Sequence, residues 1–299
     1  MSMNVGVLMG GFSEERDVSL STGLEVIKAC KVLGYKTIDM TFNQNYKKYK
    51  QVMNSCDIIF NALHGGIGEN GGIQKWMDKN NIRYTGSGSK SSSICMNKAK
   101  TKSMAANIGI KTPAWKILKY NSNNVNFDIP YVIKPNSGGS TFGLTIIEAK
   151  SALEGALRKA FHGNDKVIVE KYIKGRELTV TILDGKAYPI IEIIPSHKIY
   201  DFECKYTAGL TDYICPAKLD KELELKIMRD TEKLFQTLGC EVYSRADYIL
   251  DESGDYYFLE MNTLPGMTPT SLVPKSMKSR GMVFEQLIKN IINYSIQCR

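Results

Sequence analysis

The chain has 299 residues, of which 43% are hydrophobic, a composition typical of a globular protein whose length indicates two or three compact units. Its formal charge of +8 comes from scattered lysines that are not interleaved with aromatic residues, which argues against nucleic-acid binding. No apolar stretch is long enough to span a bilayer and no secretory signal opens the sequence, so we expect a cytoplasmic protein with no membrane contact.

The first third of the chain alternates short apolar runs with helical patterns. Strands are predicted in MNVGVLMGG, KTIDMTF and CDIIFNALHG, and helices in LSTGLEVIKACKVLGY and GGIQKWMDKNN. Strands that alternate with helices in this way are typical of a parallel sheet with crossover helices. We therefore predict a Rossmann-like α/β domain over residues 1–88.

The apolar runs come closer together from about Pro130 onward. Strands are predicted in YVIKP, LTIIEA, KVIVEKYI and ELTVTILDG, with one helix in SALEGALRKAFHG between them. This spacing indicates a small, mostly antiparallel sheet backed by helices. We place it in a central α+β domain over residues 89–178.

The last third, residues 179–299, mixes strands with two long helical patterns. Strands are predicted in YPIIEIIP, EVYSRADYIL and DYYFLEMN, and helices in KELELKIMRDTEKLFQTLG and MVFEQLIKNIINYSI. A long polar segment rich in tyrosine follows the first of these strands. The pattern predicts a C-terminal α+β domain.

The seven cysteines are widely spaced, odd in number and without a CxxC pair. This spacing argues against both a disulfide framework and a zinc site. We therefore expect reduced thiols in the core or at the surface, and we expect His162 and His197 at the surface.

The strands EVYSRADYIL and DYYFLEMN are separated by Ser253 and Gly254, which predict a hairpin with a two-residue turn. The register of the two strands then follows from Glu252 facing Asp255. Because side chains alternate between the faces of a strand, this register puts four polar groups on one face. The opposed pairs are Asp247 with Glu260, and Arg245 with Asn262.

The two opposed carboxylates of this hairpin repel each other, because directly opposed side chains lie roughly 5 Å apart at Cβ. A cation between Asp247 and Glu260 is therefore expected. Carboxylate oxygens together with the amide oxygen of Asn262 suit magnesium that also binds phosphate oxygens. The alternative is a solvated hairpin face with a salt bridge to Arg245.

A magnesium site of this kind implies a nucleotide, but the sequence has no GxxxxGK[ST] motif. The run VIKPNSGGSTFG instead places Lys134 at a strand end, before a loop rich in glycine and hydroxyl groups. Its successive backbone amides can form an anion nest, although a simple turn is the alternative. Lys98 ahead of the middle domain and Glu170 in VIVEKYIKGRE complete a pattern that suits a bound nucleotide.

In series these motifs resemble those of the D-alanine:D-alanine ligase family of ATP-grasp enzymes. The resemblance covers nearly the whole chain and rests on VLMGGFSEERDVSLSTG, HGGIGENG, VIKPNSGGSTFG, VEKYIKGRELTV, YDFECKYTAG, SRADYILD and LEMNTLPGMTPTSLVP. It implies the ATP-grasp fold, with an N-terminal Rossmann-like parallel α/β domain, a small central α+β domain and a C-terminal α+β domain.

The resemblance also implies which residues bind ATP and metal. Lys98 and Lys134 match lysines at the ATP phosphates, Glu170 an acid at the adenine edge and Glu177 an acid at the ribose hydroxyls. The whole implied nucleotide set is Lys98, Lys134, Ser137, Gly138, Gly139, Glu170, Ile173 and Glu177. The implied ligands of two Mg²⁺ ions, for which Mn²⁺ can substitute, are Asp247, Glu260 and Asn262. These are the residues that the hairpin register brings together.

Further residues are implied to hold the two D-alanine molecules and to act in catalysis. Glu15 and His64 match residues at the first D-alanine, and Ser271 and Leu272 match the pocket for the carboxylate of the second. The catalytic set implied by the resemblance also contains Arg245 and the amide of Gly266 at the oxyanion, Lys205 near the transferred phosphate, and Ser140 and Tyr206 as hydroxyls that link the central loop to the lid.

The activity implied by the resemblance is ATP-dependent ligation of two D-alanine molecules through an acyl phosphate, for peptidoglycan precursor synthesis. A homodimer is implied because similar proteins pair that way. The polar segment PSHKIYDFECKYTAGLTDYICP is the candidate lid that keeps water from the acyl phosphate. Tyr206 favours the dipeptide, because family members that make a D-lactate ester tend to have phenylalanine there.

Other interpretations remain open at the level of the sequence. The loops HGGIGENG and PNSGGST depart from the usual family pattern, and Phe202 stands where tyrosine is common. The same scaffold also suits a D-alanine:D-lactate ligase, another carboxylate-amine ligase, or a nucleotide-binding protein without catalysis. His64 can be a local hydrogen-bonding residue, Glu15 part of a charged helix start, and Ser271 a helix cap.

Overall fold

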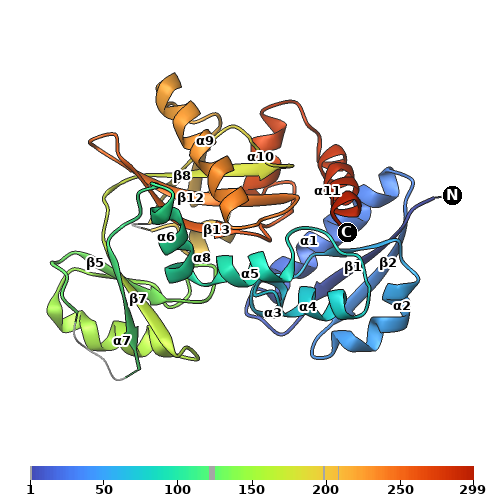
Figure 1. Ribbon diagram of the computed structural model, residues 1–299, viewed down its shortest axis with the longest axis horizontal. Helices are drawn as coiled ribbons and strands as arrows, with labels where there is room; N and C mark the ends of the chain where they lie inside the picture. The colour runs from blue at the N-terminus through green and yellow to red at the C-terminus, as the bar shows by residue number, and fades with distance from the viewer. Residues whose placement is uncertain (1, 121–124, 198, 208) are drawn as a thin grey trace.

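The strands of the protein form three sheets in the computed structural model, which describes residues 2–120, 125–197, 199–207 and 209–299 (Figure 1). The N-terminal and central sheets lie at opposite ends of the molecule in this view, and the largest sheet lies above and between them. None of the helices in the described part of the chain is long and apolar enough to cross a membrane.

The N-terminal sheet has the strand order β2-β1-β3, and both of its strand pairs are parallel. Its strands are β1 (Asn4–Gly10), β2 (Lys36–Phe42) and β3 (Ile58–Asn61), and its helices are α1 (Arg16–Val32), α2 (Lys50–Asn54), α3 (Gly66–Glu69) and α4 (Gly72–Lys79), with a 3₁₀ turn, η1 (Tyr46–Tyr49). The residues of β3 and nearly all of β1 are buried, because helices cover the sheet. The predicted parallel α/β arrangement is confirmed.

The central sheet is antiparallel throughout, in the order β4-β7-β5-β6. Its strands are β4 (Trp115–Lys119), β5 (Tyr131–Pro135), β6 (Thr145–Ile147) and β7 (Lys166–Lys171), backed by α7 (Leu153–Phe161) after the 3₁₀ turn η2 (Lys150–Ala152). The antiparallel sheet was predicted, but its membership was wrong in two strands, because β4 was missed and one strand was assigned to it that lies elsewhere. The run ELTVTILDG forms β8 (Gly175–Leu183), which pairs with strands of the third sheet instead.

The third sheet has the order β11-β10-β8-β12-β13, with β9 paired to β8. Its remaining strands are β9 (Lys186–Ala187), β10 (Ile191–Pro195), β11 (Thr211–Ile214), β12 (Tyr243–Asp251) and β13 (Tyr256–Asn262). The remaining helices of the described residues are α5 (Ser89–Met96), α6 (Lys98–Asn107), α8 (Phe202–Tyr206), α9 (Lys221–Thr237), α10 (Leu272–Lys278) and α11 (Phe284–Cys298). Residue 178 lies within β8, and the predicted domain boundaries stay predictions.

A single glycine is required where β8 begins beside β12. A Cβ on Gly175 would lie 2.1 Å from the backbone oxygen of Leu250, so any side chain there forces the two strands apart. We expect Gly175→Ala to lower the free energy of unfolding by about 1–3 kcal/mol, as overpacking does. Gly155 in α7 is the matched control, because its Cβ would meet nothing within 4 Å. Urea unfolding that found Gly155→Ala as unstable as Gly175→Ala would contradict this account.

Candidate active site

The hairpin of β12 and β13 brings the predicted polar residues together. The register pairs Asp247 with Glu260 and Arg245 with Asn262, which confirms the predicted opposition of these side chains. Both pairs line cavities at the same face of the sheet. The hairpin therefore presents two acids, a guanidinium and an amide within one site.

The turn of this hairpin differs from the prediction. Leu250 pairs with Tyr256, so three residues, and not two, separate Asp251 from Asp255. A β-bulge after Asp247 then shifts the register by one residue, because Leu259 has no opposite partner in the pairing. The longer turn and the bulge offset each other, and the acids meet as predicted.

Each acid of the hairpin is paired with a cation of the protein. Asp247 accepts from Nε and Nη2 of Arg245 at 2.9 and 2.8 Å, and from the Thr179 hydroxyl at 2.6 Å. The Glu260 carboxylate lies 2.9 Å from Nζ of Lys98, the first residue of α6. Burial raises the pKa of Glu260, but Lys98 and other nearby lysines outweigh it and hold this pKa well below its usual range. The salt bridge between Arg245 and Asp247, which the alternative of a solvated hairpin face required, is therefore present, but it lies within a larger charged site.

A cavity of about 450 Å³ lies between the central sheet and the third sheet. Apolar side chains such as Val132, Ile146 and Leu259 form part of its wall. All but one of the residues predicted to bind nucleotide line this cavity. These are Lys98, Lys134, Gly138, Gly139, Glu170, Ile173 and Glu177. Ser137 is exposed and is not among the lining residues.

A buried charge cluster forms the floor of this cavity. The Glu170 carboxylate lies 3.1 Å from Nζ of Lys134 and 3.2 Å from Nζ of Lys102. Lys102 is fully buried, and burial, partly offset by Glu170, lowers its pKa to about 8. Burial raises the pKa of Glu170, but the two lysines outweigh it, so the net shift is downward. The sequence argument missed Lys102, although it lies four residues after Lys98 and hence on the same face of α6.

A second cavity of about 310 Å³ adjoins the first, and the two share Lys98, Lys205 and Glu260. The lining of this cavity contains residues predicted for substrate, catalysis and metal binding, namely Glu15, His64, Ser140, Arg245, Asn262, Gly266, Ser271 and Leu272. They come from the segments after β1 and β3, the central loop, the hairpin of β12 and β13, and the segment after β13. The two cavities together form one site with an acidic hairpin at their junction.

Glu15 stands at the N-cap position of α1, but its side chain lines the second cavity. It precedes α1, but its side chain makes no capping hydrogen bond and is buried, whereas Glu14 is exposed. Its carboxylate accepts a hydrogen bond from the Ser140 hydroxyl. Burial first, and Glu69 second, raise the pKa of Glu15. The carboxylate thus faces the cavity from the N-terminal sheet.

His64 and Ser271 combine local hydrogen bonds with a place in the cavity wall. Nε2 of His64 lies 3.0 Å from the Thr22 hydroxyl. Ser271 precedes α10 without capping it, and its hydroxyl accepts from the Thr268 amide at 3.1 Å. The local interpretation of His64 is therefore present beside its position at the site.

The central loop contacts the candidate lid through Thr141, which the sequence argument missed. The Thr141 hydroxyl donates to the Tyr200 carbonyl at 3.0 Å and accepts from Nζ of Lys205 at 2.9 Å. The Ser140 hydroxyl donates to Glu15, and its predicted link to Tyr206 stays a prediction. Both loop residues have positive φ, +49° and +65°, which is strained for residues with a side chain and is common at functional loops. The side chain of Tyr206, the other predicted hydroxyl, lies outside the described residues.

Comparison with known proteins agrees with this geometry. Residues 104–293 match the family model described as D-ala D-ala ligase C-terminus. The D-alanine–D-alanine ligase of Halalkalibacterium halodurans is 39% identical over 99% of this chain and 100% of its own length. The chain belongs to the D-alanine–D-alanine ligase family. Its mixed parallel and antiparallel sheets are those of the ATP-grasp fold, as predicted.

Solved structures of this ligase family superpose on the whole chain. The enzyme from Bacillus anthracis complexed with ATP has a TM-score of 0.86, with 34% identity over 99% of this chain and 98% of its own. The VanG D-Ala:D-Ser ligase from Enterococcus faecalis has a TM-score of 0.85, with 26% identity over 99% of this chain and 100% of its own. The ligase scaffold is thus shared by proteins named for different acceptors.

Glu177 gives the ligase a pH dependence of stability that can be measured. Burial, and then Asp247, raise its pKa from 4.5 to about 7. A carboxyl whose pKa is raised on folding contributes stability below about pH 4.5, and this is lost as pH rises through 7. We expect Glu177→Gln to raise the free energy of unfolding by about 3 kcal/mol relative to the native chain at pH 8, and by little at pH 4. Urea unfolding at both values tests this, and an equal gain at the two would contradict it.

Proposed function

We propose that this chain joins two D-alanine molecules to D-alanyl-D-alanine, with conversion of ATP to ADP and phosphate. The observation that carries the proposal is the pair of adjoining cavities, one nucleotide-sized and lined by lysines, that meet at Glu260. Family membership supports the same reaction. The product is expected to serve peptidoglycan synthesis, and a homodimer stays a prediction.

The donor set at the junction fits magnesium. Asp247, Glu260 and Asn262 offer three oxygen-bearing side chains from one hairpin face, with no sulfur or imidazole among them. Two Mg²⁺ ions, or Mn²⁺ in their place, would there offset negative charge on the phosphoryl group in transfer. Until such ions are held, Arg245 and Lys98 balance the two acids.

The lysines of the site position the phosphates of the nucleotide. Nζ of Lys98 donates to the Gly138 carbonyl at 2.7 Å, which ties α6 to the glycine-rich loop. Lys134 enters the same cavity from the end of β5 and is oriented by Glu170. With these cations held in place, the carboxylate of the first D-alanine can attack the terminal phosphate to form an acyl phosphate.

The second step needs stabilisation of negative charge on the acyl oxygen. The amine of the second D-alanine, once deprotonated, attacks the acyl carbon and phosphate leaves. Arg245 and the segment around Gly266 line the cavity where that oxygen develops its charge. Donors aimed at such an oxygen lower the barrier more than donors aimed at the ground state.

The acceptor is the least constrained part of the proposal, since a related structure is named for D-serine. ADP release should be measured with ATP and Mg²⁺ on D-alanine alone, on L-alanine alone, and on D-alanine with D-lactate. We expect D-alanine alone to suffice and L-alanine to fail. Turnover only when D-lactate is added would favour the ester-forming alternative, and no release of ADP with any acceptor would overturn the ligase assignment.

A further inference from the structure

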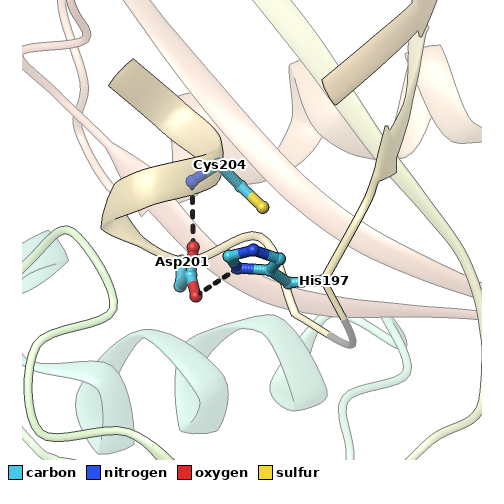
Figure 2. A group of neighbouring side chains, drawn as sticks. All are labelled: His197, Asp201 and Cys204. Carbon is cyan, nitrogen blue, oxygen red and sulfur yellow. Dashed lines mark hydrogen bonds and ion pairs between the residues drawn. The ribbon is translucent and has the colours of Figure 1, made fainter. Parts of the chain in front are cut away.

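A histidine, an aspartate and a cysteine meet in the lid, outside the residues assigned to ATP and D-alanine. Nδ1 of His197 lies 2.9 Å from Oδ2 of Asp201, and Oδ1 of Asp201 accepts from the Cys204 amide at 2.9 Å. Figure 2 shows the Asp201 carboxylate beside the imidazole ring of His197 and the Cys204 sulfur above that ring in this view. One ligand atom of each lies within 4.8 Å of the other two, and no other such trio occurs among the described residues.

The chemistry of this trio differs from that of the hairpin. Imidazole, thiolate and carboxylate together suit zinc and similar borderline-soft divalent ions, whereas the oxygen-only hairpin suits magnesium. Ligand atoms around one tetrahedral zinc lie about 3.5 Å apart, given zinc–ligand bonds of about 2.0–2.3 Å. A small movement of the side chains is therefore enough to bring the three ligand atoms from within 4.8 Å of one another to the spacing around one zinc ion. His197 can supply that movement because its side chain is 38% exposed, while Cys204 is buried.

We propose that His197, Asp201 and Cys204 form a binding site for a thiophilic divalent ion such as Zn²⁺, with water as the fourth ligand. The expectation from cysteine spacing considered CxxC pairs, and a site with one cysteine goes beyond it. Binding displaces the proton shared by His197 and Asp201 and the proton of the thiol, and both pass to solvent. Asp201 keeps Oδ1 for the Cys204 amide.

The site lies on the segment that closes both cavities. Its three ligands flank Tyr200, whose carbonyl accepts from Thr141, and Cys204 precedes Lys205, which donates to Thr141. An ion bound here ties the loop before α8 to α8 itself. We therefore expect bound Zn²⁺ to hold this segment in the arrangement described and to slow turnover, since lids must open for product release.

Cobalt is the probe that tests the site directly, because a cobalt–thiolate bond adds a near-ultraviolet absorption band that oxygen ligands do not give. Co²⁺ should be titrated into the full chain with excess Mg²⁺ present. We expect one equivalent to bind with the thiolate band in the native chain, and no such band in His197→Asn or Cys204→Ala. His197→Asn keeps the test sound if loss of the buried thiol disturbs folding.

Matched controls separate this site from adventitious binding. His162→Asn and Cys298→Ala alter an exposed histidine and the exposed cysteine elsewhere, and both are expected to keep the band. No band in the native chain, or a band that survives in His197→Asn and Cys204→Ala, would overturn the site. Zn²⁺ that slows the native chain and His197→Asn equally would show that its inhibition arises elsewhere. Because the binding readout needs no turnover, it stands apart from the proposed ligase activity.

Discussion

Replacement of Glu260 by glutamine is expected to reduce ADP release with ATP, Mg²⁺ and D-alanine by at least about a thousandfold, equivalent to about 4 kcal/mol of lost stabilisation. Glutamine keeps the size of the side chain and an oxygen that can accept from Lys98, so the fold is expected to persist. It removes the negative charge that faces Asp247 across the hairpin. The loss should therefore appear in turnover and not in the amount of folded protein.

Nucleotide binding separates the charge effect from general damage in this variant. Binding of ATP without Mg²⁺ is expected to persist in Glu260→Gln, because the positive charges of Lys98 and Lys134 remain in the cavity. Since the pKa of Glu260 lies well below its usual range, the native acid stays ionised near neutrality. The ratio of native to variant turnover should then be constant across the neutral pH range.

The control for Glu260→Gln is Glu252→Gln in the turn of the same hairpin. Glu252 forms an ion pair with Lys174 at 3.1 Å, but both side chains are more than 80% exposed, at 82% and 81%. Exposed ion pairs of this kind contribute little to the stability of a protein. Turnover of Glu252→Gln should equal that of the native chain, and an active Glu260→Gln protein would remove the basis of the metal assignment.

The hairpin shows how far alternation alone could lead. Alternation in EVYSRADYIL and DYYFLEMN is sufficient to put Asp247 and Glu260 on one face. It does not reveal the bulge at Leu259, because one extra residue leaves no mark on a strand whose two faces are both partly buried. The predicted turn was a residue too short, and the pairing survived because the bulge compensates.

Non-local pairing limited the prediction of the sheets. β8 alternates and is buried over its last six residues, like a strand of any sheet, but its partner β12 comes only after residues 184–242, which contain the lid and α9. Proximity in sequence placed it in the central sheet, whereas Gly175, which allows close approach to Leu250, begins its pairing with β12. The partner of a strand is decided by which face another element covers, and the strand's own pattern does not contain that information.

The site residues also divide into those that local motifs predict and those that depend on partners far away in the sequence. Lys134 and Glu170 could be predicted from glycine-rich and strand-end motifs, but Lys102 could not, because a lysine in the interior is exceptional. Its ammonium is held by partners from outside its own helix, which are the Glu170 carboxylate, the Thr112 hydroxyl and the Phe258 carbonyl. Thr141 was missed, since the direction of the loop depends on the two consecutive positive φ angles of Ser140 and Thr141. Positions that depend on long-range partners or on backbone conformation needed the structure.

Arg245→Lys is expected to lower kcat by about 10²–10³, the effect of losing one oxyanion donor in comparable sites. The guanidinium binds Asp247 through two nitrogens, Nε and Nη2, which leaves a further nitrogen for the acyl oxygen. Lysine keeps the positive charge but has a single ammonium nitrogen in place of the three nitrogens of a planar guanidinium. It therefore cannot orient the aspartate and donate to the substrate at the same time. Arg176→Lys breaks a similar fork to Glu192 and is expected to alter stability and not kcat.

Hydroxylamine distinguishes the two steps in the Arg245→Lys protein, because it traps an acyl phosphate as a hydroxamate. If Arg245 acts on the oxyanion of the second step, the variant still forms the acyl phosphate, and D-alanine hydroxamate should accumulate while dipeptide falls. If its main task is to hold Asp247 for phosphoryl transfer, hydroxamate and dipeptide should fall together, and the oxyanion role would be lost. The fork to Asp247 makes both outcomes physically reasonable, and the ratio of the two products decides which step this guanidinium controls.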